Sequence, residues 1–277
     1  MSSILTNNSA MSALSTLRNI NNNLSSTQDR ISSGLKVSSA KDNASYFSIS
    51  KTMSAESGMN KSINEGLTLA KNSVSTARLG AETVTELATQ FVDRLAFAQE
   101  TGVDQDKIQK ELDSLAAQMK TAIDQSSFNG ENLLETAATG KTIISGASGA
   151  GGTTAVTKIT LADVDLEAMH TAMAAIAIDN STDEAGLKAA LDAASAQLTV
   201  AVSAATDLGI TEKAIETQQD FLSELTNRLD SGVGSIVDAN MEEEAARLQS
   251  LQVQQQLSTQ ALSIANQAPQ NILSLFR

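Results

Sequence analysis

The sequence predicts a mainly α fold, an elongated antiparallel helical bundle or coiled coil with a small β-hairpin excursion. Apolar residues recur at alternating steps of three and four along several long segments, which is the spacing of a helix-packing seam. The 277 residues include a single Pro, which helix interiors exclude. Six Phe, one Tyr and no Trp leave the packing to small and aliphatic side chains, which suits closely spaced helices.

The longest periodic segment runs from residue 63 to residue 98. It predicts one helix of about 54 Å, at 1.5 Å per residue. Several of its positions are Ala, so a partner helix can approach closely. The stripe comprises Ile63, Leu67, Ala70, Val74, Ala77, Ala81, Val84, Ala88, Phe91, Leu95 and Ala98.

Two further stripes follow the same rule, one after a break near Gly102 and one late in the chain. Three stripes of one kind bury their apolar faces against each other in a bundle. The second stripe comprises Ile108, Leu112, Leu115, Met119 and Ala122, and the third Ile215, Leu222, Leu225, Leu229 and Ile236.

The segment from about 137 to 166 differs in character. Its Gly-rich centre is flanked by the β-branched runs TIIS and TAVTKITL, which predicts a hairpin. Residues 179–184 read as a loop, and a helix is expected to resume near Ala185.

The two ends of the chain carry almost no charge. Arg18 is the only charged side chain in residues 1–28, and residues 248–276 have none. Because Arg18 and Arg277 each add one positive charge, the net charge of −13 leaves about −15 for residues 29–247. Both ends keep helical apolar spacing, at Leu17, Leu24 and Ile31 and at Met241, Leu248, Leu251 and Leu262.

The ends are also rich in residues that stabilise isolated helices poorly. Ser and Asn crowd the first 33 residues and compete with the backbone for hydrogen bonds. We therefore expect both ends to need a partner surface before they order as helices.

Composition argues against several classes of function. The chain has no Cys and one His, His170, which disfavours thiolate and imidazole chemistry, and no metal or cofactor is expected. A net charge of −13 disfavours nucleic acid and anionic lipid as partners. No apolar run approaches the roughly 18 residues of a membrane span, and the N-terminus has no apolar signal core.

Three motifs resemble functional sites without fulfilling them. Gly140-Lys141-Thr142 ends like a phosphate-binding loop, but Glu135 stands where that loop needs its first Gly. The run at residues 146–152 lacks the third Gly of a dinucleotide fingerprint. Glu242, Glu243 and Glu244 are consecutive on a helix and point apart, which favours a solvated or dipole-pairing role over metal binding.

Four segments in order resemble a known family. SSGLKVSSAKDNAS, from Ser32, is similar to the SSGLRINSAKDDAA segment of bacterial flagellins, and SSFNGENLL, from Ser126, to their TQFNGxxLL stretch. LTNRLDSGVGSIVDANMEEE resembles the approach to the C-terminal helix, and ALSIANQAPQNILSLF, from Ala261, the ANQxPQNVLSLL terminus. The matches cover roughly 180 residues. The central region is short, so large outer domains are absent.

The resemblance implies a structural subunit, not an enzyme, that self-assembles into the flagellar filament for swimming motility. Residues 1–42 and 237–277 would form the inner tube, 43–136 and 186–236 the outer tube, and 137–185 a short variable region exposed to solvent. Inner-tube contacts are expected at Leu17, Leu24, Ile31, Leu248, Leu251, Leu262, Leu273 and Phe276. Outer-tube packing is expected at Ile63, Val74, Val84, Phe91, Leu95, Leu222, Leu225 and Leu229.

The implied partners are further copies and sibling flagellins, the hook-filament junction and cap proteins, an export chaperone and the type III flagellar export apparatus. The implied location is the extracellular filament, reached without a cleaved signal peptide. Two alternatives remain open from the sequence. One is a hook-filament junction protein with flagellin-like ends, and the other is a soluble helical enzyme or binding module.

Overall fold

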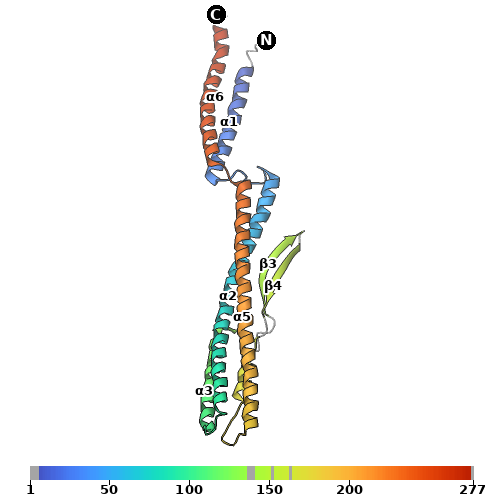
Figure 1. Ribbon diagram of the computed structural model, residues 1–277. Coiled ribbons are helices and arrows are strands. Elements are labelled where there is room, and N and C mark those ends of the chain that lie inside the picture. Colours follow the sequence, from blue (N-terminus) through green and yellow to red (C-terminus); the bar gives the residue numbers. More distant parts are fainter. Residues whose placement is uncertain (1–5, 136–140, 151–152, 162–163, 276–277) are drawn as a thin grey trace. The chain divides into compact units, whose positions relative to one another are not determined.

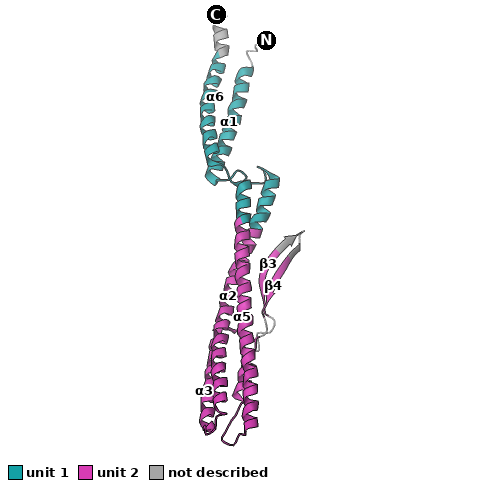
Figure 2. Cartoon of the chain, in the orientation of Figure 1, with its two compact units in different colours: residues 1–55, 228–277 teal, residues 56–227 magenta. Residues whose placement is uncertain are grey.

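The computed structural model describes residues 6–135, 141–150, 153–161 and 164–275 of the chain, and it confirms the mainly α fold (Figure 1). In chain order the elements are α1 (Asn8–Ser33), α2 (Ala44–Phe97), α3 (Gln105–Gln125), β1 (Ser127–Phe128), β2 (Glu131–Asn132), β3 (Thr142–Ala150), β4 (Thr153–Thr160), α4 (Leu166–Ala174), α5 (Glu184–Val237) and α6 (Met241–Leu275). The chain divides into two compact units (Figure 2). Unit 1 comprises residues 1–55 and 228–277, and unit 2 comprises residues 56–227.

Unit 2 contains the larger hydrophobic core, in which α2 and α5 pack together with α3 and α4. All eleven positions of the long stripe, ten in α2 and Ala98 directly after it, lie buried or half-buried, which is the placement that the alternating spacing of three and four predicts. Among the expected outer-tube positions, Val74, Val84, Phe91, Leu95 and Leu222 are buried, whereas Ile63, Leu225 and Leu229 are half-buried.

Ion pairs join α2 to the neighbouring helices at the rim of this core. Arg78 Nε lies 2.6 Å from Glu212 Oε2 of α5, and Lys71 Nζ lies 2.9 Å from Glu216 Oε1. Hydrogen bonding to Glu212 raises the pKa of Arg78, and hydrogen bonding from Lys71 lowers the pKa of Glu216. These four side chains are half-buried at the rim and remain in contact with water, so each pair fixes the helix register more than it adds stability.

The helix α2 begins nineteen residues before the stripe that predicts it. One side of its first five turns is nevertheless shielded from solvent, at Phe47, Ser50, Met53, Ser57 and Asn60. Three of these five side chains are polar, and Ser50 donates a hydrogen bond to the Phe47 carbonyl. A search for apolar spacing therefore ends at Ile63, although the helix continues toward its N-terminus.

The strands β3 and β4 form the expected antiparallel hairpin. Ile143 pairs with Ile159, and both side chains pack against the core of unit 2. A β-bulge between Ile144 and Gly146 interrupts the register. Gln218 of α5 donates a hydrogen bond of 2.8 Å from Nε2 to the Ser145 carbonyl at this bulge, which ties the hairpin to the helix.

The second half of the region expected to face solvent is partly buried. After the hairpin the chain forms α4, whose N-cap Asp165 accepts a hydrogen bond from the Ala168 amide. Leu166, Met169 and Met173 enter the core from this helix. The expectation of a solvent-facing stretch therefore does not hold at these three positions. The sequence did not indicate the helix, because nine residues are too few to show a clear helical period.

Within the described residues, none of the helices combines the length and the apolar character that crossing a membrane demands.

Candidate functional site

Helices α1 and α6 of unit 1 pack side by side and antiparallel (Figure 1). Asn7 caps the start of α1 by accepting a hydrogen bond of 3.0 Å from the Ala10 amide. Gly34 ends the helix with a φ of 72°, a left-handed conformation that suits glycine. Its amide donates to the Arg30 carbonyl, which closes the last turn. The chain can therefore turn sharply at this end of the pair.

Each helix turns one regular stripe toward the other, and we call the two stripes together the terminal seam. Apart from Arg30, the described side chains of α1 that are not exposed recur at alternating steps of three and four, and those of α6 do the same. This is the spacing of a two-stranded coiled coil. The seam consists of Ala10, Ala13, Leu17, Ile20, Leu24, Thr27 and Ile31 on α1 and Glu244, Leu248, Leu251, Gln255, Ser258, Leu262 and Ala265 on α6.

Three polar contacts along the seam fix one antiparallel register. Arg30 Nη1 lies 3.3 Å from Glu244 Oε1, and Gln255 Nε2 donates to Asn21 Oδ1 over 2.7 Å. Asn7 Nδ2 donates to the Ala265 carbonyl over 2.7 Å. The three contacts move toward the start of α1 as they move toward the end of α6, as the pairing of antiparallel helices requires. Polar groups at a seam specify register at some cost in stability.

The contact between Arg30 and Glu244 is the most buried of the three. Glu244 is buried, and its Oε2 atom has no hydrogen-bond partner within the described residues. Arg30 is 30% exposed at its side chain. Glu244 therefore depends on Arg30 for the compensation of its charge.

We expect the Arg30→Ala variant to lose about 1–2 kcal/mol of unfolding free energy in unit 1. The buried Glu244 carboxylate would keep its desolvation cost without its partner, and the partial exposure of Arg30 limits the loss. The double variant Arg30→Met/Glu244→Leu should recover most of it, because both charges are then gone. Urea titrations followed by far-UV circular dichroism would measure both effects, and equal losses in the two variants would contradict this role for the pair.

The base of the pair is closed by backbone contacts and a tight turn. Leu35 forms an isolated bridge with Asp238, and the Ala239 amide donates to the Gly34 carbonyl over 2.8 Å. In the following turn, Asp42 Oδ2 accepts hydrogen bonds from the amides and hydroxyls of Ser38 and Ser39. The amide of Ser39 contributes most to lowering the pKa of Asp42 below its usual 3.8.

The turn should consequently weaken in acid. Because the pKa of Asp42 is lower in the folded chain, its contribution to stability is present above pH 3.8 and is lost as the pH falls through the folded value. We expect the Asp42→Ala variant to unfold at a lower urea concentration than the wild type at neutral pH. In strong acid the two proteins should unfold at the same urea concentration. Lys41→Ala, a change at an exposed neighbour, is the control, and a difference that persists unchanged in acid would contradict the assignment.

The expected inner-tube residues lie in the terminal seam where the structure describes them. Leu251 is buried, and Leu17, Leu24, Ile31, Leu248 and Leu262 are half-buried. The side chain of Leu273 and all of Phe276 lie outside the described residues. Sequence reasoning missed a second apolar stripe on α6, at Val253, Leu257 and Ile264, whose side chains are exposed. Its signal was a helical spacing displaced by two residues from that of the seam.

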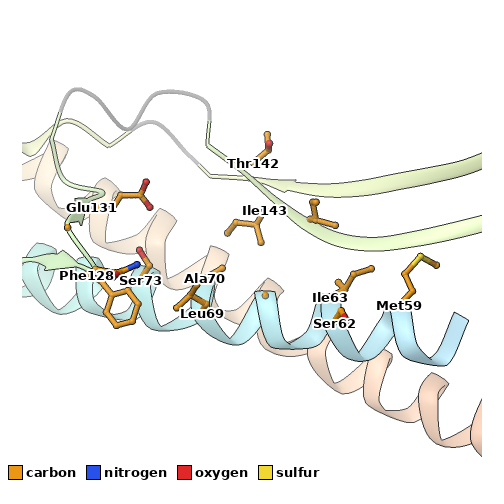
Figure 3. A pocket seen from close by; sticks show the side chains of 14 residues that line it. Met59, Ser62, Ile63, Leu69, Ala70, Ser73, Phe128, Glu131, Thr142 and Ile143 are labelled. Carbon is orange, nitrogen blue, oxygen red and sulfur yellow. The ribbon is translucent and has the colours of Figure 1, made fainter. Parts of the chain in front are cut away.

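A hollow of about 780 Å³ in unit 2 lies between α2, the β1–β2 turn and β3 (Figure 3). Ile143 of β3 points from the strand toward α2, and Met59 and Ile63 line the helix side. Glu131 is the one titratable residue in its lining, and its carboxylate forms an ion pair with Lys141. Lys141, the lysine of the apparent phosphate-binding loop, is thus already paired with a carboxylate. The residues that line the hollow offer no convergent set of polar groups.

The consecutive glutamates at the start of α6 do not form a metal site. Glu243 pairs with Arg247 and Glu244 pairs with Arg30, while Asn240 accepts hydrogen bonds from the amides of Glu242 and Glu243. Among the described residues, no three His, Asp or Glu side chains are grouped closely enough to hold a metal ion.

Comparison with known proteins assigns the chain to a family. The family model of the bacterial flagellin N-terminal helical region matches residues 4–139, and that of the bacterial flagellin C-terminal helical region matches residues 189–276. Flagellin from Brucella melitensis is 38% identical, and Flagellin C from Rhizobium meliloti is 36% identical, each over 100% of both chains. Flagellin FljK from Caulobacter vibrioides is 32% identical over 100% of this chain and 99% of its own.

These matches over the full length of flagellins set aside the alternatives of a junction protein and a soluble binding module. The extracellular filament is the location of this family's members. The chain therefore belongs to the bacterial flagellin family and is a structural subunit of the flagellar filament.

Proposed function

We propose that this chain builds the filament through its paired terminal helices, which complete their folding against further copies of the chain. The observation that carries the proposal is the terminal seam. It joins the two ends of the chain, and beyond Arg247 the described part of α6 has no charged side chain. A surface of this kind can be enclosed by neighbours without burying unpaired charge.

The weakness of the seam supports ordering on assembly. Thr27, Gln255 and Ser258 occupy seam positions that a stable coiled coil would give to aliphatic residues. Ser and Asn in α1 lower the intrinsic stability of that helix further. A pair that is marginal alone and stable among copies would prevent premature polymerisation in the cell.

The proposed division of labour follows the flagellin resemblance. Residues 1–42 and 237–277 form the inner tube, 43–136 and 186–236 form the outer tube, and the outer part of 137–185 faces solvent. A head-to-tail contact that every subunit repeats gives an open helix of copies, including sibling flagellins. The hook-filament junction and cap proteins bind the two ends of this polymer.

Export is the remaining part of the proposal. An export chaperone keeps the ends apart in the cell, and the type III flagellar export apparatus passes the chain outward without cleavage of a signal peptide. The filament serves as a structural element, and no catalytic step is assigned to it.

The test compares dilute monomer with polymer grown on filament seeds. We expect the helical signal per residue in far-UV circular dichroism to rise as the wild-type chain elongates the seeds, because the ends become ordered. Electron microscopy would identify the product as filaments. Failure to elongate seeds, or elongation with no gain of helix, would contradict the proposal.

A further inference from the structure

We propose that Asn129 is a site of covalent modification, at which the side-chain amide is lost by spontaneous deamidation. Asn129 and Gly130 connect β1 to β2, and we call these two residues the Asn-Gly turn. The inference goes beyond the proposed function, because it concerns the chemical lifetime of the folded chain and requires no second copy.

The two strands define the geometry of the Asn-Gly turn. Phe128 of β1 pairs with Glu131 of β2, so only two residues connect the strands. Their φ values are 52° at Asn129 and 79° at Gly130. A two-residue turn of type I′ requires a positive φ at both positions, which favours Asn followed by Gly. Among the described residues, Asn129 is the only one other than glycine that has a positive φ.

The residues that suit the turn also have the chemistry for ring closure. The amide nitrogen of Gly130 attacks Cγ of Asn129, and glycine leaves this nitrogen unhindered because it has no Cβ. As the new C–N bond forms, the bond from Cγ to Nδ2 breaks, and Nδ2 leaves as ammonia with the proton of the backbone amide. Water then opens the cyclic imide at one of its two carbonyls, which gives aspartate or isoaspartate. Water is the only co-reactant.

Access and sequence single out Asn129 among the asparagines. Both residues of the turn are exposed, and a Cβ atom placed on Gly130 would meet nothing within 4 Å, so the ring and the water have room. Asn129 is also the only Asn in the sequence that is followed by Gly. Asn180 is exposed too, but it precedes a serine. Its Oδ1 accepts from the Gln105 amide over 2.9 Å, and its Nδ2 donates to Asp106 Oδ2 over 2.7 Å.

The folded turn restrains the reaction. In the left-handed conformation of Asn129, the nitrogen of the next residue points away from Cβ, so the backbone must rotate before attack. Asn132 fixes the second strand, because its Nδ2 donates to the Ile123 carbonyl over 2.7 Å and its Oδ1 accepts from the Leu134 amide over 3.1 Å. Leu134 is fully buried. The reaction therefore proceeds through opening of the turn, and the folded chain should react more slowly than the unfolded chain.

Conversion changes both the charge and the backbone of the turn. Isoaspartate routes the main chain through the former side chain, and the added carbon does not fit a two-residue turn. Either product places a new carboxylate two residues from Glu131, in a chain with a net charge of −13. Phe128 and Glu131, which flank the turn, line the hollow beside α2 (Figure 3). We therefore expect the converted chain to melt at a lower temperature than the fresh chain.

The experiment incubates the full wild-type chain at mildly alkaline pH, folded in buffer and unfolded in guanidinium chloride. Mass spectrometry of digests measures conversion at each Asn, and a methyltransferase specific for isoaspartate identifies that product. In the folded chain we expect conversion of Asn129 before Asn180. In denaturant Asn129 should convert at least about tenfold faster, because the rate follows the population of the open turn. Asn132→Ala, which releases the second strand, should accelerate the folded reaction at least about threefold.

Asn129→Gly is the matched control, because glycine adopts a positive φ and has no amide to lose. After the same incubation it should keep its melting curve, whereas that of the wild type shifts to lower temperature. An unmodified Asn129 in the folded chain after the unfolded chain has converted, or earlier conversion of Asn180, would overturn the proposed site. Equal rates in the folded and unfolded chains would overturn the restraint by the turn. Neither result depends on filament growth, so the proposed function is tested separately.

Discussion

Replacing Phe91 with Ala is expected to lower the unfolding free energy of unit 2 by about 3–5 kcal/mol, the cost of removing a large buried ring. Phe91 is 1% exposed and lies among the buried side chains that α2, α3 and α5 contribute to the core. The neighbouring backbone belongs to a long regular helix, which cannot collapse into the space that the ring vacates. The cavity therefore persists, and the loss should lie toward the upper part of that range.

The same helix provides a matched control six residues away. Phe97 is 50% exposed at the end of α2, so Phe97→Ala removes an equal volume and leaves no cavity. We expect a change of less than about 1 kcal/mol, as for surface substitutions generally. Urea titrations of both variants, followed by far-UV circular dichroism, would measure the contrast. Similar losses in the two would contradict the assignment of Phe91 to the core.

Gly80→Ala is expected to destabilise unit 2 by about 1–3 kcal/mol, the usual cost of overpacking. A Cβ atom at Gly80 would lie 1.8 Å from Ser126 Oγ and 2.7 Å from Ser126 Cβ. Ser126 is buried, and its hydroxyl donates to the Ala122 carbonyl over 2.6 Å. The loop after α3 would thus have to move away from α2. The φ of Gly80 is not positive, so its backbone conformation does not require glycine. The close approach of Ser126 does.

Gly66 on the same helix gives the opposite expectation. An added Cβ there meets nothing within 4 Å, so Gly66→Ala should gain up to about 1 kcal/mol from helix propensity alone. The double variant Gly80→Ala/Ser126→Gly should recover part of the loss, because it removes both clashing Ser126 atoms. Thermal melts of the three variants would measure this. If Gly80→Ala proved as stabilising as Gly66→Ala, the close approach of Ser126 would be refuted.

Much of the fold could be predicted because the spacing of aliphatic residues along the sequence indicates which side of each helix is buried. Val74, Val84 and Leu95 repeat the helical period without interruption, and the structure buries all three. The first turns of α2 could not be found in this way, because Ser57 and Asn60 take up buried positions. Helix α4 could not be predicted either, since Met169 and Met173 span little more than one turn and show no helical period.

The candidate site was predictable only in part. Leu24 and Leu251 could be found from their spacing, but one sequence cannot tell a stripe that faces its own partner helix from one that faces solvent. The spacing of Val253 and Leu257 is as helical as that of Leu248 and Leu251. The distinction depends on which side of α6 the helix α1 covers, which long-range contacts such as that of Gln255 with Asn21 decide.

The most direct test of a filament built through the terminal helices uses the absence of cysteine from the chain. The L257C variant places one thiol on the exposed side of α6 that faces away from α1, and its reaction with a maleimide reagent can be timed in monomers and in seeded filaments. The account predicts fast labelling in the monomer, strong protection in the filament and recovery of fast labelling when the same filaments are depolymerised by heat. Equal labelling rates in monomer and filament would contradict it.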